Sequence, residues 1–396
     1  MAAAAPFRWF LAGQAVSMAG SAMAPVALAF GVLGLTHSAV WLSVVTTSAL
    51  IPMVATLLLG GGVADRYPRD TVLRLTSVAA GLTQAGVAAL LLTHRHPAFL
   101  IPLSVLNGVA QGLIRPTLRG ILANLVDSAG LQRASSLLSS AGNVTAILGP
   151  AAAGLLTASV GGGWAIAVDA ASFLVAAACF GRMALPRLPA RTRDSPGMIA
   201  ELRQGWGYFR SHAWIWSVTM GFAVFNGLNR AIWQILGPVI AAVTIGPQGW
   251  GLVLSTRGAG ALLGAAIMVR LPLRRPMIPA LTAMSVAALP LILLGAGAST
   301  VWLALSAFVG GVATELFTVV WTTVNNVHIP ERLLSRVGAH DEFWSTAPAP
   351  LGQLATPFLA AVFGSAATAI AGGTIAAVAI LLPLTVPALR EIEIRR

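Results

Sequence analysis

Charge is the scarcest feature of this sequence. Of its 396 residues only 9% are charged, and no Asp, Glu, Lys or Arg occurs between Trp9 and Ala64. Lysine is absent altogether, so all 24 basic residues are arginines. A soluble domain carries about 25% charged residues because its surface faces water. With 57% hydrophobic residues and a mean hydropathy of +0.83, this chain cannot cover itself with such a surface, and we expect lipid around it.

Other absences exclude whole classes of function. Cys179 is the only cysteine, which excludes an internal disulfide. A chain without lysine has no G-x-x-x-x-G-K-[ST] loop and cannot be its own ATPase. The sequence shows neither a metal-spaced cluster nor the nucleophile–base pair that an intramembrane enzyme needs. The net charge of +12 lies in short breaks between apolar runs, not on one folded face. We expect no enzyme, cofactor, metal or nucleic-acid partner.

Long apolar runs dominate what is present. A run of about 20 apolar residues spans a bilayer. The sequence predicts an all-α membrane protein with twelve transmembrane helices, at 9–33, 40–63, 72–93, 98–121, 134–158, 164–184, 214–240, 249–269, 276–296, 300–324, 343–364 and 367–388. The longest polar break divides the spans six and six. We therefore expect an N-terminal six-helix bundle (1–185), a cytoplasmic linker (186–212) and a C-terminal six-helix bundle (213–396).

The arginines are distributed asymmetrically about these runs. If the N-terminus is cytoplasmic, 21 of the 24 arginines fall at inner ends or inner loops. Only Arg95 falls in an outer loop, whereas Arg230 and Arg257 fall inside spans. Because basic residues are enriched in cytoplasmic loops, this distribution predicts a multi-pass protein of the cell inner (plasma) membrane with both termini cytoplasmic.

The two halves resemble each other weakly. GQAV at 13–16 returns as GFAV at 221–224, and GGGVADRYPRD at 60–70 aligns with GAAIMVRLPLR at 264–274. Many transporters are built from such internal repeats, with the substrate site between them. The repeat predicts two pseudo-symmetric bundles.

Five charges arrive within ten residues, from Asp65 to Arg74, directly after a triple glycine, in LLLGGGVADRYPRDTVLRL at 57–75. We predict a short inner loop between the second and third spans, with Asp65 accepting hydrogen bonds at a helix end. Arg66 and Arg69 would hold the loop against neighbouring cytoplasmic ends, as a latch that opens when two bundles rock. The alternative is an ordinary positively charged inner loop.

Two motifs resemble the major facilitator superfamily. The loop resembles its G-x-x-x-D-R-x-x-R motif at Gly61, Asp65, Arg66 and Arg69, and GNVTAILGPAAAGLL resembles its fifth-span exporter motif at Gly142, Gly149, Pro150 and Gly154. Segments at 165–177, 235–241 and 336–353 resemble its macrolide-efflux and enterobactin-exporter-like branch. The resemblance covers essentially the whole chain and implies a conformational latch, a central cavity and proton-driven export, with antibiotic resistance as a consequence.

The sequence departs from that pattern at two positions. Drug exporters of the superfamily often carry a fourth-span Arg before Gln-Gly, whereas LNGVAQG places Asn107 there and keeps Gln111 and Gly112. Proton coupling through that Arg is therefore in doubt. In the second-half loop Val269 stands at the position of Asp65, so only one latch is complete.

Polar residues inside membrane spans are costly and suggest function by default. Glu315 and Arg230 lie about 15 residues into their predicted spans, near mid-membrane at a rise of ~1.5 Å per residue. The resemblance places both spans on the cavity, where we expect Glu315 to couple protons and Arg230 to pair with it. A purely structural pair is the alternative. The other candidate cavity residues are Asn226, Asn229, Gln234, Asn107, Gln111 and Trp321.

Four other charged residues lie in or beside the predicted spans; we expect a structural role for three of them, and the fourth, Arg257, has two alternative roles. Asp169 falls near the outer start of the sixth predicted span, where it would bond a helix end. Asp341 and Glu342 open the eleventh span and would cap it. Arg257 lies in the outer half of the eighth span, where a structural partner and a ligand role are equally plausible.

These features predict a secondary active transporter, a proton-coupled exporter (antiporter) of a small amphipathic drug-like or natural-product molecule. We expect its partners to be this small-molecule substrate, protons and the lipid bilayer, and the protein to be a monomer. An importer of a nutrient or siderophore, working as symporter or facilitator, is the first alternative. A transport-inactive sensor or scaffold is the second.

Overall fold

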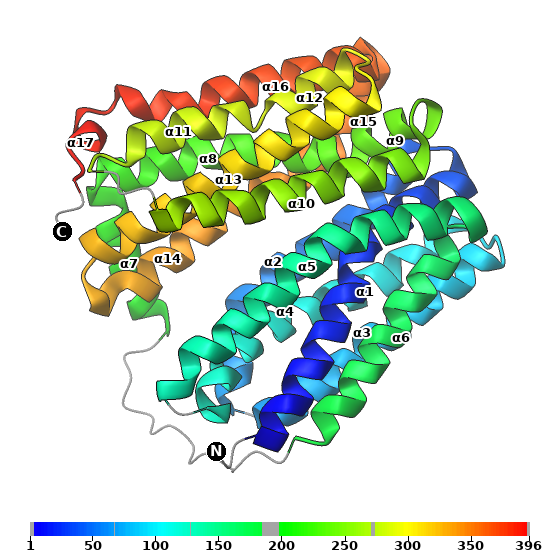
Figure 1. Ribbon diagram of the computed structural model, residues 1–396, viewed down its shortest axis with the longest axis horizontal. Helices are drawn as coiled ribbons and strands as arrows, with labels where there is room; N and C mark the ends of the chain where they lie inside the picture. Colours follow the sequence, from blue (N-terminus) through cyan, green and yellow to red (C-terminus); the bar gives the residue numbers. More distant parts are fainter. Residues whose placement is uncertain (1–3, 67, 127, 184–197, 271–273, 394–396) are drawn as a thin grey trace. The chain divides into compact units, whose positions relative to one another are not determined.

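The computed structural model describes residues 4–66, 68–126, 128–183, 198–270 and 274–393, and these residues form helices and turns without a strand (Figure 1). Clustering of contacts divides the chain into a first unit, Met1–Thr192 with Ala241–Ser255, and a second unit, Arg193–Ile240 with Thr256–Arg396. Each unit is described by itself below.

The first unit is built from long helices joined by short turns. Its elements are α1 (Ala4–Thr36), α2 (Ala39–Arg66), α3 (Arg69–Leu92), η1 (Pro97–Phe99), α4 (Leu100–Leu125), α5 (Ser128–Val160) and α6 (Gly162–Gly181). Gly161 separates α5 from α6 at φ +93°, a backbone conformation that favours glycine. Within this unit α3 packs against α4 and α6, α1 against α5 and α6, and α2 against α4.

The second unit contains more and shorter helices. They are α7 (Met198–Ser211), α8 (Ala213–Ala231), η2 (Ile232–Leu236), α9 (Gly237–Val243), α10 (Gly246–Arg270), α11 (Met277–Val286), α12 (Leu289–Gly295), α13 (Thr300–His328), α14 (Glu331–Thr346), α15 (Pro348–Phe363), α16 (Ser365–Leu381), η3 (Leu382–Thr385) and α17 (Pro387–Arg390). The first part of α10, through Ser255, clusters with the first unit.

The helix pairings of the first unit recur in the second. There α12 packs against α16, α8 against α15 and α16, and α13 against α11 and α12. These pairs take the places of α3–α6, α1–α5, α1–α6 and α3–α4. Close approach by glycine also recurs: a Cβ on Gly108 of α4 would overlap the Ala49 carbonyl of α2, and one on Gly260 of α10 would overlap the Phe308 carbonyl of α13. The weak sequence repeat is therefore accompanied by a repeated pairing of helices.

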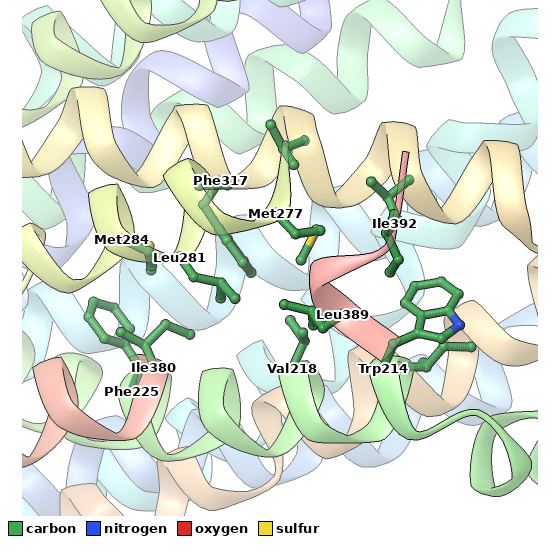
Figure 2. Packing of buried hydrophobic residues seen from close by; sticks show 14 of the residues in the cluster. Trp214, Val218, Phe225, Met277, Leu281, Met284, Phe317, Ile380, Leu389 and Ile392 are labelled. Carbon is green, nitrogen blue, oxygen red and sulfur yellow. The ribbon is translucent and has the colours of Figure 1, made fainter. Parts of the chain in front are cut away.

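An apolar core fills the second unit between α8, α11, α13, α16 and the C-terminal segment. Figure 2 shows Val218 and Phe225 of α8 facing Leu281 and Met284 of α11, with Phe317 of α13 nearby. Because lipid chains are as apolar as these side chains, such helices associate through close van der Waals packing and interhelical hydrogen bonds. A core of this kind positions the few polar groups between the helices.

Ten helices in the described residues are long and apolar enough to cross a membrane. The predicted spans 214–240 and 343–364 are not among them, and each is interrupted; the predicted span 276–296 is also interrupted, between α11 and α12, but is among the ten. The first is divided into α8, η2 and α9, and the second begins as α14 at Glu331 and breaks between Thr346 and Pro348. The linker predicted at 186–212 contains α7, an amphipathic helix that packs against α14.

Candidate functional site

Polar side chains follow one face of α8 towards its C-terminal end. The Asn226 amide Nδ2 donates to the Ser345 carbonyl of α14 (2.9 Å), and its Oδ1 accepts from Arg230 Nε (3.2 Å). Arg230 lies 17 residues after the first residue of α8, roughly 25 Å along the helix. The Arg230 guanidinium is therefore held deep within α8 by the Asn226 amide, which is itself hydrogen-bonded to α14.

A π-helical turn follows Arg230, at Ile232–Leu236. Pro238 explains it: proline has no N–H and its ring crowds the carbonyl four residues earlier, which is that of Gln234. The Gly237 N–H accordingly donates to the Ile232 carbonyl, five residues back. Single π turns are frequent at functional sites. Here the turn carries Trp233 and Gln234, whose side chains reach two different helices.

Gln234 contacts the second broken helix of this unit. Gln353 of α15 is fully buried and its Nε2 donates to the Gln234 Oε1. Pro348 stands at the first position of α15, where its missing N–H costs nothing. A Cβ on Gly352 would lie 2.8 Å from the Gly227 carbonyl of α8. The two interrupted helices are thus packed backbone to backbone, with a buried amide pair between them.

Trp233 contacts α10. The Arg257 guanidinium lies over its ring, with Cζ 5.3 Å from the ring centroid. Arg257 is the twelfth of the 25 residues of α10, roughly 16 Å from its start and near its middle. The structure thus brings Arg257 of α10 and Trp233 together in the second unit.

Glu315 lies in the middle of α13, half-buried, with its Cβ against Gly264 of α10. Within the described residues its carboxylate makes neither a hydrogen bond nor an ion pair, so the pairing expected with Arg230 is not formed. A carboxylate without a partner does not tie two helices together. This finding weighs against a purely structural role.

Asp341 corrects the sequence-based expectation. It lies well inside α14 instead of opening a helix, since that helix already begins at Glu331. Its Oδ1 accepts from the Thr219 hydroxyl of α8 (2.6 Å) and its Oδ2 from the Trp321 indole N–H of α13 (2.8 Å). Asp341 is therefore an acceptor that joins three helices, and Trp321 is one of its donors.

Asp169 requires a similar correction. It is the eighth residue of α6, 1% exposed, and its Oδ2 accepts from Gln84 Nε2 of α3 (2.6 Å). Its Oδ1 lies against Gly20 of α1 and has no hydrogen-bond partner in the described part of the chain. Asp169 does not bond a helix end but links α3 and α6.

The two fourth-span candidates lie on α4. Asn107 is half-buried and its Nδ2 donates to the Thr83 hydroxyl of α3 (3.2 Å). Gln111 is half-buried on the same helix, one turn further on.

The fifth-span motif lies inside α5 and serves close packing. A Cβ on Gly149 would lie 2.5 Å from that of Ala22 of α1, and one on Gly142 would lie 3.3 Å from the Met18 methyl. Gly154 approaches the Pro247 carbonyl, in the part of α10 that belongs to the first unit. Pro150 is buried within the helix.

The predicted latch is described only in part. The side chains of Gly61, Asp65 and Arg66 lie outside the described residues, although α2 itself extends through Arg66. The loop is therefore shorter than the sequence suggests. Arg69 is the first residue of α3, half-buried and engaged in an interaction, and Asp70 lies in the first turn, where a negative charge is favourable.

Sequence reasoning missed four contributors to these networks: Trp233, Gln353, Gln84 and Thr219. Gln353 and Gln84 carried a signal, since each is an amide within an apolar run. Trp233 and Thr219 carried none, because aromatic and hydroxyl side chains are common in membrane helices. In the described residues, no group of three or more His, Cys, Asp or Glu side chains is placed to hold a metal ion.

Long apolar helices with a repeated pairing, and charged groups at the depth of the membrane, define a multi-pass helical membrane transporter. Comparison with known families agrees with this class: the profile of the Major Facilitator Superfamily matches residues 10–337. The chain belongs to the Major Facilitator Superfamily. It is a transporter of that type and not an enzyme.

Two kinds of relative are found among characterised proteins. The multidrug efflux pump Tap of Mycolicibacterium fortuitum is 26% identical over 396 residues, covering 95% of this chain and 94% of that protein. Tap of Mycobacterium tuberculosis (strain ATCC 25618 / H37Rv) is 25% identical, covering 96% and 93%. The staphyloferrin A transporter of Staphylococcus aureus is 28% identical over 157 residues, only 38% of either chain.

Solved structures share the fold. The nucleoside transporter NupG superposes with a TM-score of 0.78 at 14% identity, covering 98% of this chain and 100% of that one. A POT family transporter in complex with 5-aminolevulinic acid gives a TM-score of 0.76 at 13% identity, covering 97% and 96%. At these identities the likeness concerns the fold alone.

Proposed function

We propose that this protein is a proton-coupled exporter of a small amphipathic drug-like or natural-product molecule. The observation that carries the proposal is Glu315: a carboxylate in the middle of a spanning helix, without a hydrogen bond or ion pair in the described residues. The full-length similarity to Tap efflux pumps supports export of a drug-like molecule. Membrane proteins bury ionisable groups mainly where they function.

The proposal includes the architecture expected from the sequence. Twelve spans would form two six-helix bundles (1–185 and 213–396) joined by a cytoplasmic linker (186–212), with both termini in the cytoplasm and the protein in the inner membrane as a monomer. The recurrence of helix pairings and the arginine distribution support this arrangement. The interrupted helices α8–α9 and α14–α15 would be the two spans beyond the ten helices of spanning length.

In this mechanism Glu315 takes up a proton in one half of the cycle and releases it in the other. A carboxylate without a fixed partner suits this role, because no ion pair has to be broken when the proton arrives. The other polar candidates would line the substrate path: Asn226, Asn229, Gln234, Trp321, Asn107 and Gln111. The loop at Gly61, Asp65, Arg66 and Arg69 would act as the latch.

The experiment is uphill transport by proteoliposomes under an imposed pH gradient, with internal proton flux recorded alongside. The probes are ethidium, an amphipathic cation, and fluorescein, an amphipathic anion. We expect Glu315→Gln, which mimics the protonated form, to lose uphill movement of whichever probe the wild type transports, while downhill movement persists. Glu331→Gln, at the exposed start of α14, is the matched control. Uphill pumping by Glu315→Gln with proton flux intact contradicts the proposal.

A second candidate, import of a siderophore, is favoured by one specific observation, the match to the staphyloferrin A transporter over 157 residues. The same vesicles distinguish the two, because an exporter and a symporter move substrate and protons in opposite relative directions. A transport-inactive sensor or scaffold would move neither and would tolerate loss of Glu315 and Arg230.

A further inference from the structure

The amphipathic helix α7 has no role in the transport mechanism proposed above. Only His212 separates its last residue, Ser211, from α8, the first part of a proposed span. Because one residue bridges at most ~3.6 Å, α7 ends close to the membrane surface. Trp216, in the first turn of α8, is 42% exposed, and tryptophan is enriched at the boundary between membrane and water. The helix therefore lies at the level of the lipid headgroups.

One face of α7 is packed on α14, its neighbour in Figure 1. A Cβ on Gly205 would lie 2.8 Å from the Arg336 carbonyl of α14, and Arg336 Nη1 donates to the Gln204 Oε1. Phe209, one turn after Gly205, is buried in the apolar core of the second unit. These contacts determine which face of α7 points outward.

The outward face carries two arginines and an open glycine. Arg203, Gly207 and Arg210 are spaced by four and three residues, so they lie on one side of the helix, and all three are exposed. A Cβ on Gly207 would meet nothing within 4 Å. Trp206 is 38% exposed, and its ring centroid lies 6.0 Å from that of the exposed Trp344 of α14. Bare backbone thus lies between two guanidiniums, with exposed indole rings nearby.

Neither guanidinium on this face is neutralised. Within the described residues Arg203 and Arg210 make no hydrogen bond or ion pair. The sequence of α7 contains one acidic residue, Glu201, so the helix has a net positive charge. Arginine presents its donors in a planar fork that matches phosphate. A helix with arginines on its polar face and aromatic rings beside them is typical of the membrane interface.

We propose that the face formed by Arg203, Gly207 and Arg210 binds the headgroup of an anionic phospholipid, with the phosphate over Gly207 between the two guanidiniums. The partner is a lipid and not a soluble anion, because α7 ends at the membrane surface and exposed indole rings favour that environment over water. Through its contacts with α14, a lipid-bound α7 would hold the start of that interrupted helix at the membrane surface. This inference requires that α8 enters the membrane, and it is independent of what the protein transports.

The test measures which lipid lies beside α7 in the full-length protein. Cys179→Ser removes the native thiol, and Ser335→Cys, at an exposed position of α14 next to Arg336, accepts a fluorescent label. The labelled protein is reconstituted in vesicles with phosphatidylglycerol or phosphatidylcholine, each with the same spin label near the headgroup end of its acyl chain. We expect phosphatidylglycerol to quench the fluorescence with an association constant roughly 5- to 25-fold higher, since each arginine at an anionic surface contributes about fivefold.

Variants of the same labelled protein separate charge from folding. Arg203→Gln with Arg210→Gln should abolish the preference for phosphatidylglycerol, whereas Arg203→Lys with Arg210→Lys should retain most of it. Arg95→Gln, at an exposed turn of the first unit, should leave it unchanged. Gly207→Leu keeps both charges but covers the bare backbone, and should weaken the preference if the phosphate lies there.

Three results would overturn the proposal. Equal quenching by the two lipids without any arginine substitution would show that α7 does not select anionic lipid. An unchanged preference after loss of both Arg203 and Arg210 would assign the selection to other residues. If millimolar inorganic phosphate relieves the quenching by phosphatidylglycerol, the two arginines bind a soluble anion instead. Because the test needs no pH gradient, it can fail while proton-driven transport is intact, and the reverse.

Discussion

The two units share a framework of helix pairs but use their polar residues differently. In the first unit Asp169 and Asn107 each bond a side chain of α3, and α1 to α6 are continuous helices. In the second unit the two helices that contain Asn226 and Gln353 are interrupted, and Glu315 stands without a partner in the described residues. The repeat therefore preserves the helix pairing, whereas the interrupted helices of Asn226 and Gln353 and the carboxylate of Glu315 lie in the second unit.

This difference suggests a division of labour. The first unit contains both glycine-rich motifs, the loop after α2 and the stretch from Gly142 to Gly154, which we propose act through close approach and conformational change. The second unit contains Glu315, which we propose acts through its charge. Irregular backbone in the second unit fits this view, because broken helices place polar groups at depths where regular ones would present apolar faces.

The largest effect is expected from overpacking the first unit at Gly149. Gly149→Leu would push α5 from Ala22 of α1, and overpacking a tight contact costs typically ~1–3 kcal/mol and shifts backbone. We expect transport to stop while a labelled substrate still binds in detergent, since the charged groups lie in the other unit. Gly34→Leu, where a side chain meets open space, is the control. Undiminished transport by Gly149→Leu would show that this contact is not needed.

The next effect concerns the loop after α2, the predicted latch. Asp65→Asn and Arg69→Ala should leave insertion and abundance near normal while transport falls several-fold. An unpaired surface charge contributes only ~0–1 kcal/mol, so an ordinary loop would tolerate both changes. Arg74→Ala, an exposed arginine further along α3, is the matched control. Normal transport by both variants at matched expression refutes the latch and removes one side of the comparison.

Much of the fold was readable from the sequence because an apolar run of spanning length rarely folds as anything but a membrane helix. The ten candidate spanning helices coincide closely with predicted spans, as α6 at Gly162–Gly181 does with 164–184. The interruptions were missed because the apolar character continues through them. Pro238 and Pro348 were visible, but proline in a membrane helix predicts a kink as readily as a π turn or a break.

The site was less predictable, for reasons that lie in tertiary contacts. Glu315 and Arg230 stood out because charge is rare at their depth, but their separation could not be read from depth alone. Asp341 was assigned to a helix start because the apolar run begins beside it. Pro330 followed by Glu331 marked the earlier start of α14. Sequence spacing gave no indication that Thr219 and Trp321 donate to Asp341 from two other helices.

The smallest effect is expected from the buried carboxylate of the first unit. Asp169→Asn keeps an oxygen that can accept from Gln84, so the link between α3 and α6 should survive. A neutral bond of this kind is worth about 1 kcal/mol, and thermal unfolding in detergent should change little. Proton flux and uphill transport should match the wild type, in contrast to Glu315→Gln.

This variant tests the comparison most directly because Asp169 also has an unbonded oxygen, Oδ1, beside Gly20. If that oxygen takes up the transported proton, Asp169→Asn will abolish proton flux while the protein stays folded and Glu315→Gln keeps pumping. Proton coupling would then be a function of the first unit, and the proposed assignment of close packing to the first unit and charge to the second would be reversed. Gln84→Leu separates the structural role of Asp169 from a role in coupling. Loss of the Gln84 donor should lower the stability of the protein, because the buried carboxylate of Asp169 then has no hydrogen bond. Proton coupling should not change if Glu315 carries the proton.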